Sequence, residues 1–253
     1  MVLLVDAGNT RIKWARVQGE KLGTRYAAVH GRLSTADYRR RLFGKHPPER
    51  VLIASVAGAR VNAALAAVAR RAHIKARFVR VPRRAGMVTV GYREPWRWGV
   101  DRYVAAVGAV HLFRGIAVCV VGVGTALTVD LIGADGRHRG GVIIPSPALM
   151  VESLLSQTHG IRRRARGGAT GDGGFFARST RSGLVQGSRY AAAALIDRAV
   201  EEAGRLLGKR PLAVLTGGEA SSVRPLVRNP CVGVPDLVLR GLAVLAREPQ
   251  RRP

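Results

Sequence analysis

The sequence contains little that would indicate a disulfide-stabilised, metal-clustered or membrane-embedded protein. Its 253 residues include only two cysteines, Cys119 and Cys231, without the paired spacing of zinc ligands. We expect both to be buried small hydrophobic residues in a reducing compartment. The N-terminus lacks the basic region and apolar core of a signal peptide, and no apolar run reaches membrane-spanning length. These absences predict a cytoplasmic protein with no membrane partner.

Acidic residues are also scarce, with 16 Asp and Glu against 42 Lys and Arg, which gives a formal net charge of +26. Such an excess would ordinarily indicate a nucleic-acid or anionic-surface partner. However, only five of the basic residues are lysines, and the arginines are scattered, as a GC-rich coding bias would produce. We therefore expect an acidic small-molecule ligand, with nucleic acid bound at most nonspecifically.

Two segments each end a buried strand in small and hydroxylated residues. The first is V-L-L-V-D-A-G-N-T at Val2–Thr10, and the second is V-C-V-V-G-V-G-T-A-L-T-V-D at Val118–Asp130. Such a break lets the backbone turn sharply and offer N–H groups to an anion, above all a nucleotide phosphate. Asp6 would repel this phosphate unless a divalent cation lay between them, so Asp6 is a Mg²⁺ candidate. One copy could be an ordinary turn, whereas two copies favour a nucleotide site.

Strands and helices alternate along the chain, which predicts an α/β fold with mixed sheets. In the first half we expect a strand that begins at Val2 and further strands at Arg11–Val17, Arg25–Val29, Arg50–Val56 and Lys75–Val81. We expect helices there at Ala36–Phe43, Val61–Ala72 and Asp101–Phe113. In the second half we expect strands at Ile116–Val123, Ala126–Ile132, Gly140–Ile144 and Leu212–Leu215, with helices from Pro147 toward Ser156, at Leu184–Leu207 and at Pro235–Arg247. Each half opens with a strand, a glycine turn and a strand. We therefore expect domains at 1–115 and 116–253, with a ligand in the cleft between them.

Several other segments give less specific signals. The arginine- and glycine-rich stretch Gly160–Gly174 favours a mobile loop, with a polyanion-binding loop as the alternative. Trp96 and Trp98 are expected to be packing residues, and the six histidines have no catalytic or metal-ligand spacing. The tail Gln250–Pro253 is expected to be disordered.

Five segments, taken in order, resemble the type III pantothenate kinase family, also called the Bvg accessory factor family. They are D-A-G-N-T-R-I-K at Asp6–Lys13, G-V-D-R at Gly99–Arg102, G-T-A-L-T-V-D at Gly124–Asp130, G-G-V-I-I-P at Gly140–Pro145 and P-D-L-V-L-R-G-L at Pro235–Leu242. This family belongs to the acetate and sugar kinase, heat-shock 70 and actin superfamily. The resemblance implies two ribonuclease-H-like domains with mixed sheets flanked by helices and an active-site cleft between them. It also implies ATP-dependent phosphorylation of pantothenate, the first step of coenzyme A synthesis, by a homodimer.

The chemistry of phosphoryl transfer suggests roles for these residues. Asp6 would hold Mg²⁺, Lys13 could add a point charge, and Thr125 would complete the phosphate clamp. The ATP-binding candidates are Asp6, Ala7, Gly8, Asn9, Thr10, Arg11, Ile12, Lys13 and Thr125.

By similarity to the family, Asp101 is the catalytic base, and Arg102 can pair with the pantothenate carboxylate. The remaining positions that match the family's pantothenate site are Tyr92, Gly99, Val100 and Thr180. Without the resemblance, the Asp101-Arg102 pair would indicate a helix cap with a solvated partner, and Thr180 would also indicate a helix cap. Thr216-Gly217-Gly218, which follows a strand, resembles the nucleoside-contact turn of the superfamily.

The sequence departs from the family pattern at two places. Many members carry an acidic residue that binds a monovalent cation where this chain has Gly122, which leaves a K⁺ or NH₄⁺ requirement in doubt. Glycine usually follows the G-G-x-I-x-P motif, whereas this chain has Ser146-Pro147. The altered residues predict a locally different backbone with less consequence for the chemistry.

A second hypothesis remains open from the sequence. The high positive charge and Gly122 would also suit a catalytically impaired homologue that acts as a regulatory or nucleic-acid-binding protein. Retention of Asp6 and Asp101 favours the kinase.

Overall fold

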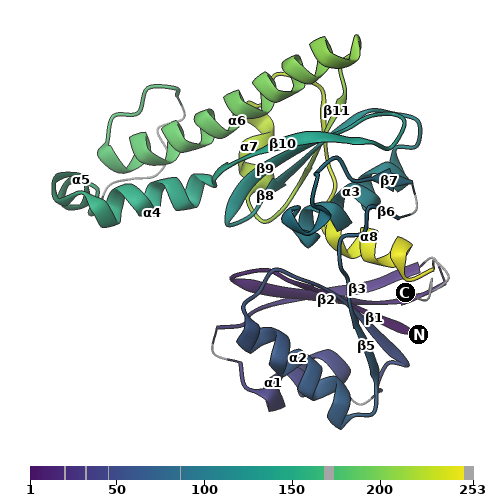
Figure 1. Ribbon diagram of the computed structural model, residues 1–253. Helices are drawn as coiled ribbons and strands as arrows, with labels where there is room; N and C mark the ends of the chain where they lie inside the picture. Colours follow the sequence, from purple (N-terminus) through teal and green to yellow (C-terminus); the bar gives the residue numbers. More distant parts are fainter. Residues whose placement is uncertain (20, 32, 45, 86, 168–173, 248–253) are drawn as a thin grey trace. The chain divides into compact units, whose positions relative to one another are not determined.

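Each of the two glycine-turn segments provides the central strand of a five-stranded sheet, β1 in one and β8 in the other (Figure 1). A computed structural model describes the chain except residues 20, 32, 45, 86, 168–173 and 248–253. The first sheet has the order β3-β2-β1-β4-β5, formed by β1 (Val2–Ala7), β2 (Arg11–Gln18), β3 (Lys21–Val29), β4 (Arg50–Ser55) and β5 (Lys75–Phe78). The second has the order β10-β9-β8-β11-β12, formed by β8 (Val118–Val123), β9 (Ala126–Ile132), β10 (His138–Pro145), β11 (Leu212–Thr216) and β12 (Cys231–Gly233). In both sheets an antiparallel hairpin precedes parallel strands, which is the mixed arrangement predicted.

One face of the first sheet is covered by α1 (Thr35–Phe43) and α2 (Ala59–Arg71), which lie side by side (Figure 1). Leu3, Val5 and Ala7 of β1 belong to the apolar cluster formed with these helices. Because successive side chains of a strand point to opposite faces, Leu4 and Asp6 lie on the other face. The helix α1 begins at a capping box in which the Ser34 hydroxyl accepts a hydrogen bond from Asp37 N–H at 3.1 Å.

The other face of this sheet contacts α3 (Val100–Leu112) and α8 (Leu237–Leu245). Both helices are predominantly apolar, and each buries most of its residues. They approach closely because Gly241 has no side chain: a Cβ there would lie 1.9 Å from the carbonyl oxygen of Val104. This close packing anchors the first turns of α3 and α8, which carry charged residues.

The second sheet buries one face against α6 (Thr180–Leu207). Cys119, Val121 and Val123 of β8 share an apolar cluster with Ala192 and Ile196 of this helix. Gly122, between these residues, therefore faces the opposite side of the sheet. Cys119 is buried as expected, whereas Cys231 is only partly buried.

The remaining elements of the described residues are two short strands, three α-helices and two 3₁₀ helices. They are β6 (Arg84–Ala85), β7 (Val88–Thr89), the 3₁₀ helix η1 (Pro95–Arg97), α4 (Pro147–Gln157), α5 (His159–Arg164), α7 (Ala220–Val223) and the 3₁₀ helix η2 (Arg224–Leu226). The helix from Pro147 was expected, but the loop prediction for Gly160–Gly174 was wrong at α5, where Arg162–Arg164 continue a helix. The remainder of this stretch at 168–173 and the tail Gln250–Pro253 lie outside the described residues.

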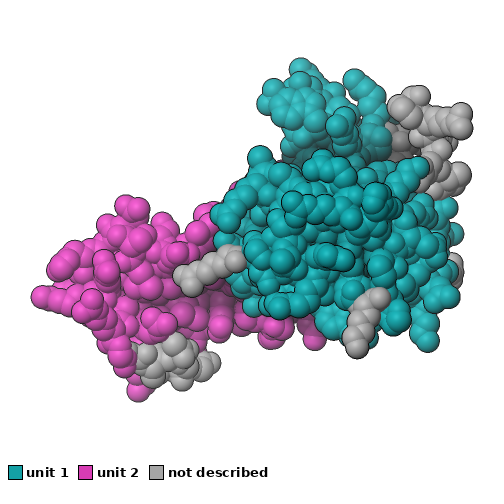
Figure 2. Space-filling view, turned by 90° about the horizontal axis from the view of Figure 1, so that it is seen from below, with its two compact units in different colours: residues 1–115, 136–138, 236–253 teal, residues 116–135, 139–235 magenta. Residues whose placement is uncertain are grey.

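The chain forms two compact units (Figure 2). One contains Met1–Gly115 together with Gly136–His138 and the segment that begins at Asp236; the other contains Ile116–Asp135 and Arg139–Pro235. Along the sequence, the chain thus first passes from one unit to the other after Gly115. The closing helix α8, which we expected in the second domain, instead packs against α3 in the first unit. No helix within the described parts of the chain is long and apolar enough to cross a membrane.

Replacement of Gly241 by alanine should destabilise the first unit, because the new methyl group would overlap the Val104 carbonyl. We expect a loss of about 3 kcal/mol or more in the free energy of unfolding, measured by urea denaturation. Gly187→Ala is the matched control, since Gly187 lies within α6 with nothing within 4 Å of its Cβ position. The control should gain up to about 1 kcal/mol from helix propensity. Equal effects of the two substitutions would contradict the packing argument.

Candidate functional site

Asp6 and Lys13 lie opposite each other in the β1–β2 hairpin. Their neighbours in the register, Ala7 with Ile12 and Val5 with Trp14, belong to the cluster on the α1–α2 face. Asp6 and Lys13 therefore project from the opposite face, which α3 and α8 contact. The strand pairing alone brings together two of the predicted ATP-binding residues.

The turn between these strands contains Gly8, Asn9 and Thr10. Gly8 N–H donates to the Arg11 carbonyl at 3.0 Å, and Asn9 and Thr10 are exposed. His30, which follows β3, contacts the turn at two points. Its ring Nε2 lies 2.7 Å from the Gly8 carbonyl oxygen, and its backbone N–H donates to the Thr10 carbonyl at 3.4 Å. No role was predicted for His30, because its contact with the turn depends on the β2–β3 register.

The start of α3 contributes Asp101 and Arg102, with Gly99 at the N-cap. Asp101 Oδ1 accepts a hydrogen bond from Arg102 N–H at 2.9 Å, which helps to fix the carboxylate at the first helical turn. Arg102 is largely buried, with 9% of its surface exposed. A solvated partner, which the pair would indicate without the family resemblance, therefore does not describe Arg102.

The electrostatic environment links Asp6 to the starts of both helices. The pKa of Asp6 is raised to about 7: burial is the largest cause, the Lys13 ammonium opposes it by lowering the pKa, and the carboxylates of Asp101 and Asp236 add to the rise. Asp236 is the N-cap residue of α8. Lys13, Asp101 and Asp236 therefore all act electrostatically on Asp6 within the first unit. Asp236 was not among the predicted site residues.

An aromatic stack lies next to the start of α3, where Trp98 also contacts Tyr103. The ring centroids of Trp98 and His138 are 4.0 Å apart, those of Tyr92 and His138 are 5.5 Å apart, and both pairs are stacked. Trp98 is buried, which confirms its packing role, whereas the packing prediction for Trp96 was wrong because 70% of Trp96 is exposed. Tyr92 is partly buried against this stack, so one face of its ring is fixed.

The second glycine turn lies in the other unit, after β8. Gly124 N–H donates to the Ala126 carbonyl at 3.0 Å, and the Thr125 carbonyl accepts from Ser146 N–H at 3.4 Å. Ser146 is itself the N-cap of α4, and its hydroxyl accepts from Leu149 N–H at 3.2 Å. Ser146-Pro147, a departure from the family pattern, thus provides a favourable helix start.

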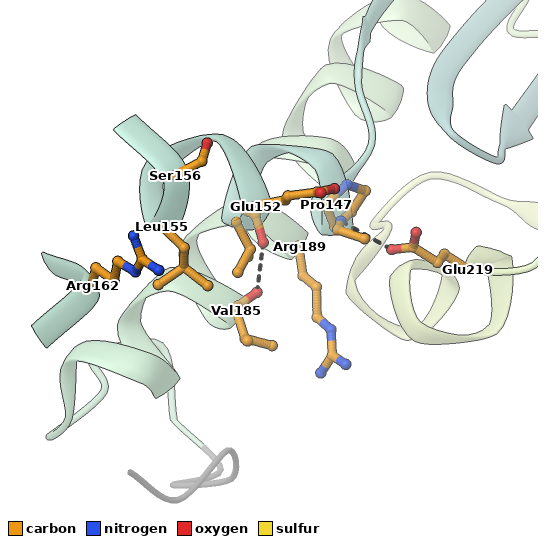
Figure 3. A pocket seen from close by; sticks show the side chains of 11 residues that line it. Pro147, Glu152, Leu155, Ser156, Arg162, Val185, Arg189 and Glu219 are labelled. Carbon is orange, nitrogen blue, oxygen red and sulfur yellow. Dashed lines mark hydrogen bonds between the residues drawn. The ribbon is translucent and has the colours of Figure 1, made fainter. Parts of the chain in front are cut away.

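The turn Thr216-Gly217-Gly218 packs against the end of β8. Gly217 has a φ of +106°, and a Cβ there would lie 2.2 Å from the Val123 carbonyl oxygen, so only glycine fits. The Glu219 carboxylate that follows accepts a hydrogen bond from Ala148 N–H at 3.2 Å. A cavity of about 610 Å³ borders Glu219, with Arg162, Arg189 and residues of α4 and α6 in its wall (Figure 3).

Thr180 is the first residue of α6, but Ser179 provides the N-cap, and its side chain accepts from Ser182 N–H at 3.1 Å. The helix cap expected at Thr180 is therefore one residue earlier, at Ser179. Thr180 instead lines a second cavity of about 450 Å³ with residues of α4 and α6. Thr125 and Thr180 thus belong to one unit, and the other predicted site residues belong to the other.

The described residues contain no group of three His, Cys, Asp or Glu side chains arranged to hold a metal ion. This finding fits Mg²⁺, which usually binds through one or two carboxylates and completes its coordination with water and substrate phosphates. Asp6, a partly buried carboxylate with further carboxylates near it, is the residue best suited to hold such an ion.

The raised pKa of Asp6 predicts how stability depends on pH in protein treated with EDTA. An unfolded aspartate titrates near pH 4, so between about pH 4 and 7 the folded state binds more protons than the unfolded state. The contribution of Asp6 is therefore fully present below about pH 4 and is lost as the pH rises through about 7. Urea denaturation of Asp6→Asn and the unmodified chain across this range should show the variant gaining relative stability with pH. Parallel curves would contradict the raised pKa of Asp6.

The comparisons with known proteins are consistent along nearly the whole chain. A model of the family described as type III pantothenate kinase matches residues 2–202. The chain is 34% identical to the type III pantothenate kinase of Nitrosococcus oceani over 98% of this chain and 94% of the relative. It is 37% identical to that of Aromatoleum aromaticum over 98% of each chain. A ROK family glucokinase from Streptomyces griseus shares the fold, with a TM-score of 0.54 and 14% identity over 97% of this chain and 99% of that structure. The chain therefore belongs to the type III pantothenate kinase family.

Proposed function

We propose that this protein is an ATP-dependent pantothenate kinase that forms 4′-phosphopantothenate, the first step of coenzyme A synthesis. Family membership supports the substrate pair, and the observation that carries the chemistry is the grouping of Lys13 and Asp101 around Asp6 within the first unit. The regulatory alternative has no observation in its favour, since both carboxylates required for phosphoryl transfer are present.

Binding of ATP begins with its phosphates. The exposed residues Asn9 and Thr10 of the turn would offer backbone N–H groups to the phosphates, while Gly8 N–H holds the turn through the Arg11 carbonyl. The Lys13 ammonium adds a positive charge beside the turn. Asp6 would hold Mg²⁺ at this turn, and the ion supplies charge neutralisation for the β- and γ-phosphates. Ala7, Arg11 and Ile12 position the turn through the hairpin register, and Thr125 of the second turn contributes a further phosphate contact.

For the nucleoside end of ATP we propose the Thr216-Gly217-Gly218 turn. The neighbouring cavity beside Glu219 offers volume for a small organic group (Figure 3). Its wall combines apolar residues of α4 and α6 with two arginines and two glutamates, Glu152 and Glu219, so it offers both hydrogen-bond donors and acceptors to a polar ligand.

For pantothenate we propose contacts with Tyr92, Gly99, Val100 and Arg102, together with Thr180. The stacked ring of Tyr92 provides a fixed apolar surface. The Arg102 guanidinium would pair with the pantothenate carboxylate, for which its planar shape is suited. Burial of Arg102 strengthens such a pair because fewer water molecules compete for it.

Asp101 acts as the general base in this mechanism. It accepts the proton of the pantothenate primary hydroxyl as the hydroxyl oxygen forms a bond to the γ-phosphorus of ATP. The bond between this phosphorus and the bridging oxygen breaks, and ADP leaves with the electron pair. The hydrogen bond from Arg102 N–H holds the Asp101 carboxylate in a defined orientation for this step.

We also propose a homodimer in the cytoplasm. Apolar side chains on α4 are partly exposed in the single chain, with Leu149 at 36% and Leu154 at 42% exposure, and they would suit a surface between two copies.

A coupled assay that follows ADP production with ATP and pantothenate tests the proposed activity directly. We expect pantothenate-dependent ADP release, with phosphopantothenate identified by mass spectrometry. Absence of the phosphorylated product under saturating conditions would overturn the proposed function.

The same assay should separate the roles of Asp101 and Arg102. Asp101→Asn should lower kcat by about 10²–10⁴-fold with little change in pantothenate affinity, because only proton acceptance is lost. Arg102→Ala should mainly raise the dissociation constant of pantothenate, because its contact exists before and during transfer. Arg102→Lys, which retains the charge but not the planar fork, is the control for packing and should recover only part of this affinity. A fully active Asp101→Asn enzyme would remove the base assignment.

The requirement for a monovalent cation can be tested at Gly122. Gly122 pairs with Thr128 in the β8–β9 register, and a Cβ at this position would lie only 2.9 Å from Thr128 Oγ1. Because this position provides no carboxylate, we expect similar rates in K⁺, NH₄⁺ and Na⁺ at constant ionic strength. Activity that appears only with K⁺ or NH₄⁺ would show that another group holds the cation.

A further inference from the structure

Asp236 belongs to the P-D-L-V-L-R-G-L segment but has no part in the mechanism above. It adopts a left-handed backbone conformation with φ 53° and ψ 40°, although it is not glycine. Only His73 shares a positive φ among the non-glycine residues that the structure describes. Such a conformation costs free energy and is retained where the surrounding contacts require it.

Capping of its own helix does not explain this conformation. Asp236 is the N-cap residue of α8, but its side chain makes no capping hydrogen bond to the first turn. The carboxylate instead points toward the first sheet. Asp236 Oδ1 lies 3.2 Å from Lys13 Nζ, and Oδ2 lies 3.5 Å from a guanidinium nitrogen of Arg25.

The two basic residues come from neighbouring positions of adjacent strands. Lys13 pairs with Ala27 and Ala15 pairs with Arg25 in the β2–β3 register, so Lys13 and Arg25 project from the same face two residues apart. The Asp236 side chain is 20% exposed, Lys13 is 28% exposed and Arg25 is 45% exposed. The Lys13 contact is thus the better shielded of the two and is less weakened by solvent.

This contact determines where the Lys13 ammonium lies. The Lys13 ammonium is already close enough to Asp6, its partner across β1 and β2, to act on it electrostatically, and its flexible side chain could otherwise turn fully onto this carboxylate. Such an approach would place a positive charge on the carboxylate proposed to hold Mg²⁺. Asp236 offers an alternative anion and keeps the ammonium available beside the Gly8-Asn9-Thr10 turn.

We propose that Asp236 is a positioning residue that holds the Lys13 ammonium at the ATP phosphate site without contacting ATP or pantothenate itself. The inference rests on the proposed role of Lys13 in ATP binding. Asp236 thereby links the start of α8 to the β1–β2 hairpin and makes nucleotide affinity depend on the C-terminal segment.

Asp236→Asn is the most informative variant, because asparagine tolerates the left-handed conformation but removes the charge. We expect a roughly tenfold rise in the dissociation constant of Mg·ATP and in KM for ATP, with KM for pantothenate unchanged, as for the loss of one charged contact. Asp236→Gly removes the carboxylate and also relieves the backbone constraint, so it should show the same nucleotide defect without a lower melting temperature. Arg25→Ala, which removes the more exposed partner of Asp236, is the control and should bind ATP normally.

A double-mutant cycle with Lys13→Met distinguishes positioning from a general structural effect. If Asp236 acts through Lys13, Asp236→Asn should have almost no further effect on ATP affinity in the Lys13→Met protein. Equal effects of Asp236→Asn in both backgrounds, or unchanged ATP affinity accompanied by a lower melting temperature, would overturn the proposal.

Calorimetric titration with Mg·ATP in the absence of pantothenate keeps this test separate from the proposed activity. A protein that binds Mg·ATP but does not phosphorylate pantothenate would refute the proposed substrate, whereas the cycle would still decide the role of Asp236. An unmodified chain that binds no Mg·ATP would refute both.

Discussion

The register between β1 and β2 is the constraint on which the site depends. It places Asp6 opposite Lys13, and the alternation of the strands directs both away from the core under α1 and α2. A shift of one residue would exchange these charged side chains with the apolar residues Ala7 and Ile12. The burial of one face of the hairpin therefore determines the position of the charged groups on the other.

The site concentrates negative charge within a strongly basic chain. The overall charge of +26 attracts anionic substrates from a distance, but Asp6, Asp101 and Asp236 act at short range. Unneutralised, these carboxylates would oppose binding of the ATP phosphates. Lys13 and the proposed Mg²⁺ resolve this conflict, and the starts of α3 and α8 add the positive ends of helix dipoles. The same local negative charge and burial raise the pKa of Asp6.

Much of the fold could be predicted because its signals are local. Apolar runs identified the strands, and Pro147 marked a helix start. The packing of α8 with α3, the stack of His138 on Trp98 and the contact of His30 with Gly8 depend on residues distant in sequence, so no local pattern revealed them. For the proposed site, the sequence motifs led to the prediction of Asp6 and Asp101. The structural role of Asp236 was missed because its partners, Lys13 and Arg25, lie more than two hundred positions earlier.

The central claim is that the Asp6 carboxylate and the Lys13 ammonium together form the metal and phosphate site of this kinase. The most direct test is an anomalous difference map from crystals grown with Mn²⁺, in place of Mg²⁺, and a non-hydrolysable ATP analogue. The account predicts a Mn²⁺ peak at the Asp6 carboxylate, directly or through one bound water, with the analogue's phosphates in contact with Lys13 and the Gly8-Asn9-Thr10 turn. A metal peak remote from Asp6, or phosphates bound away from this turn, would contradict it.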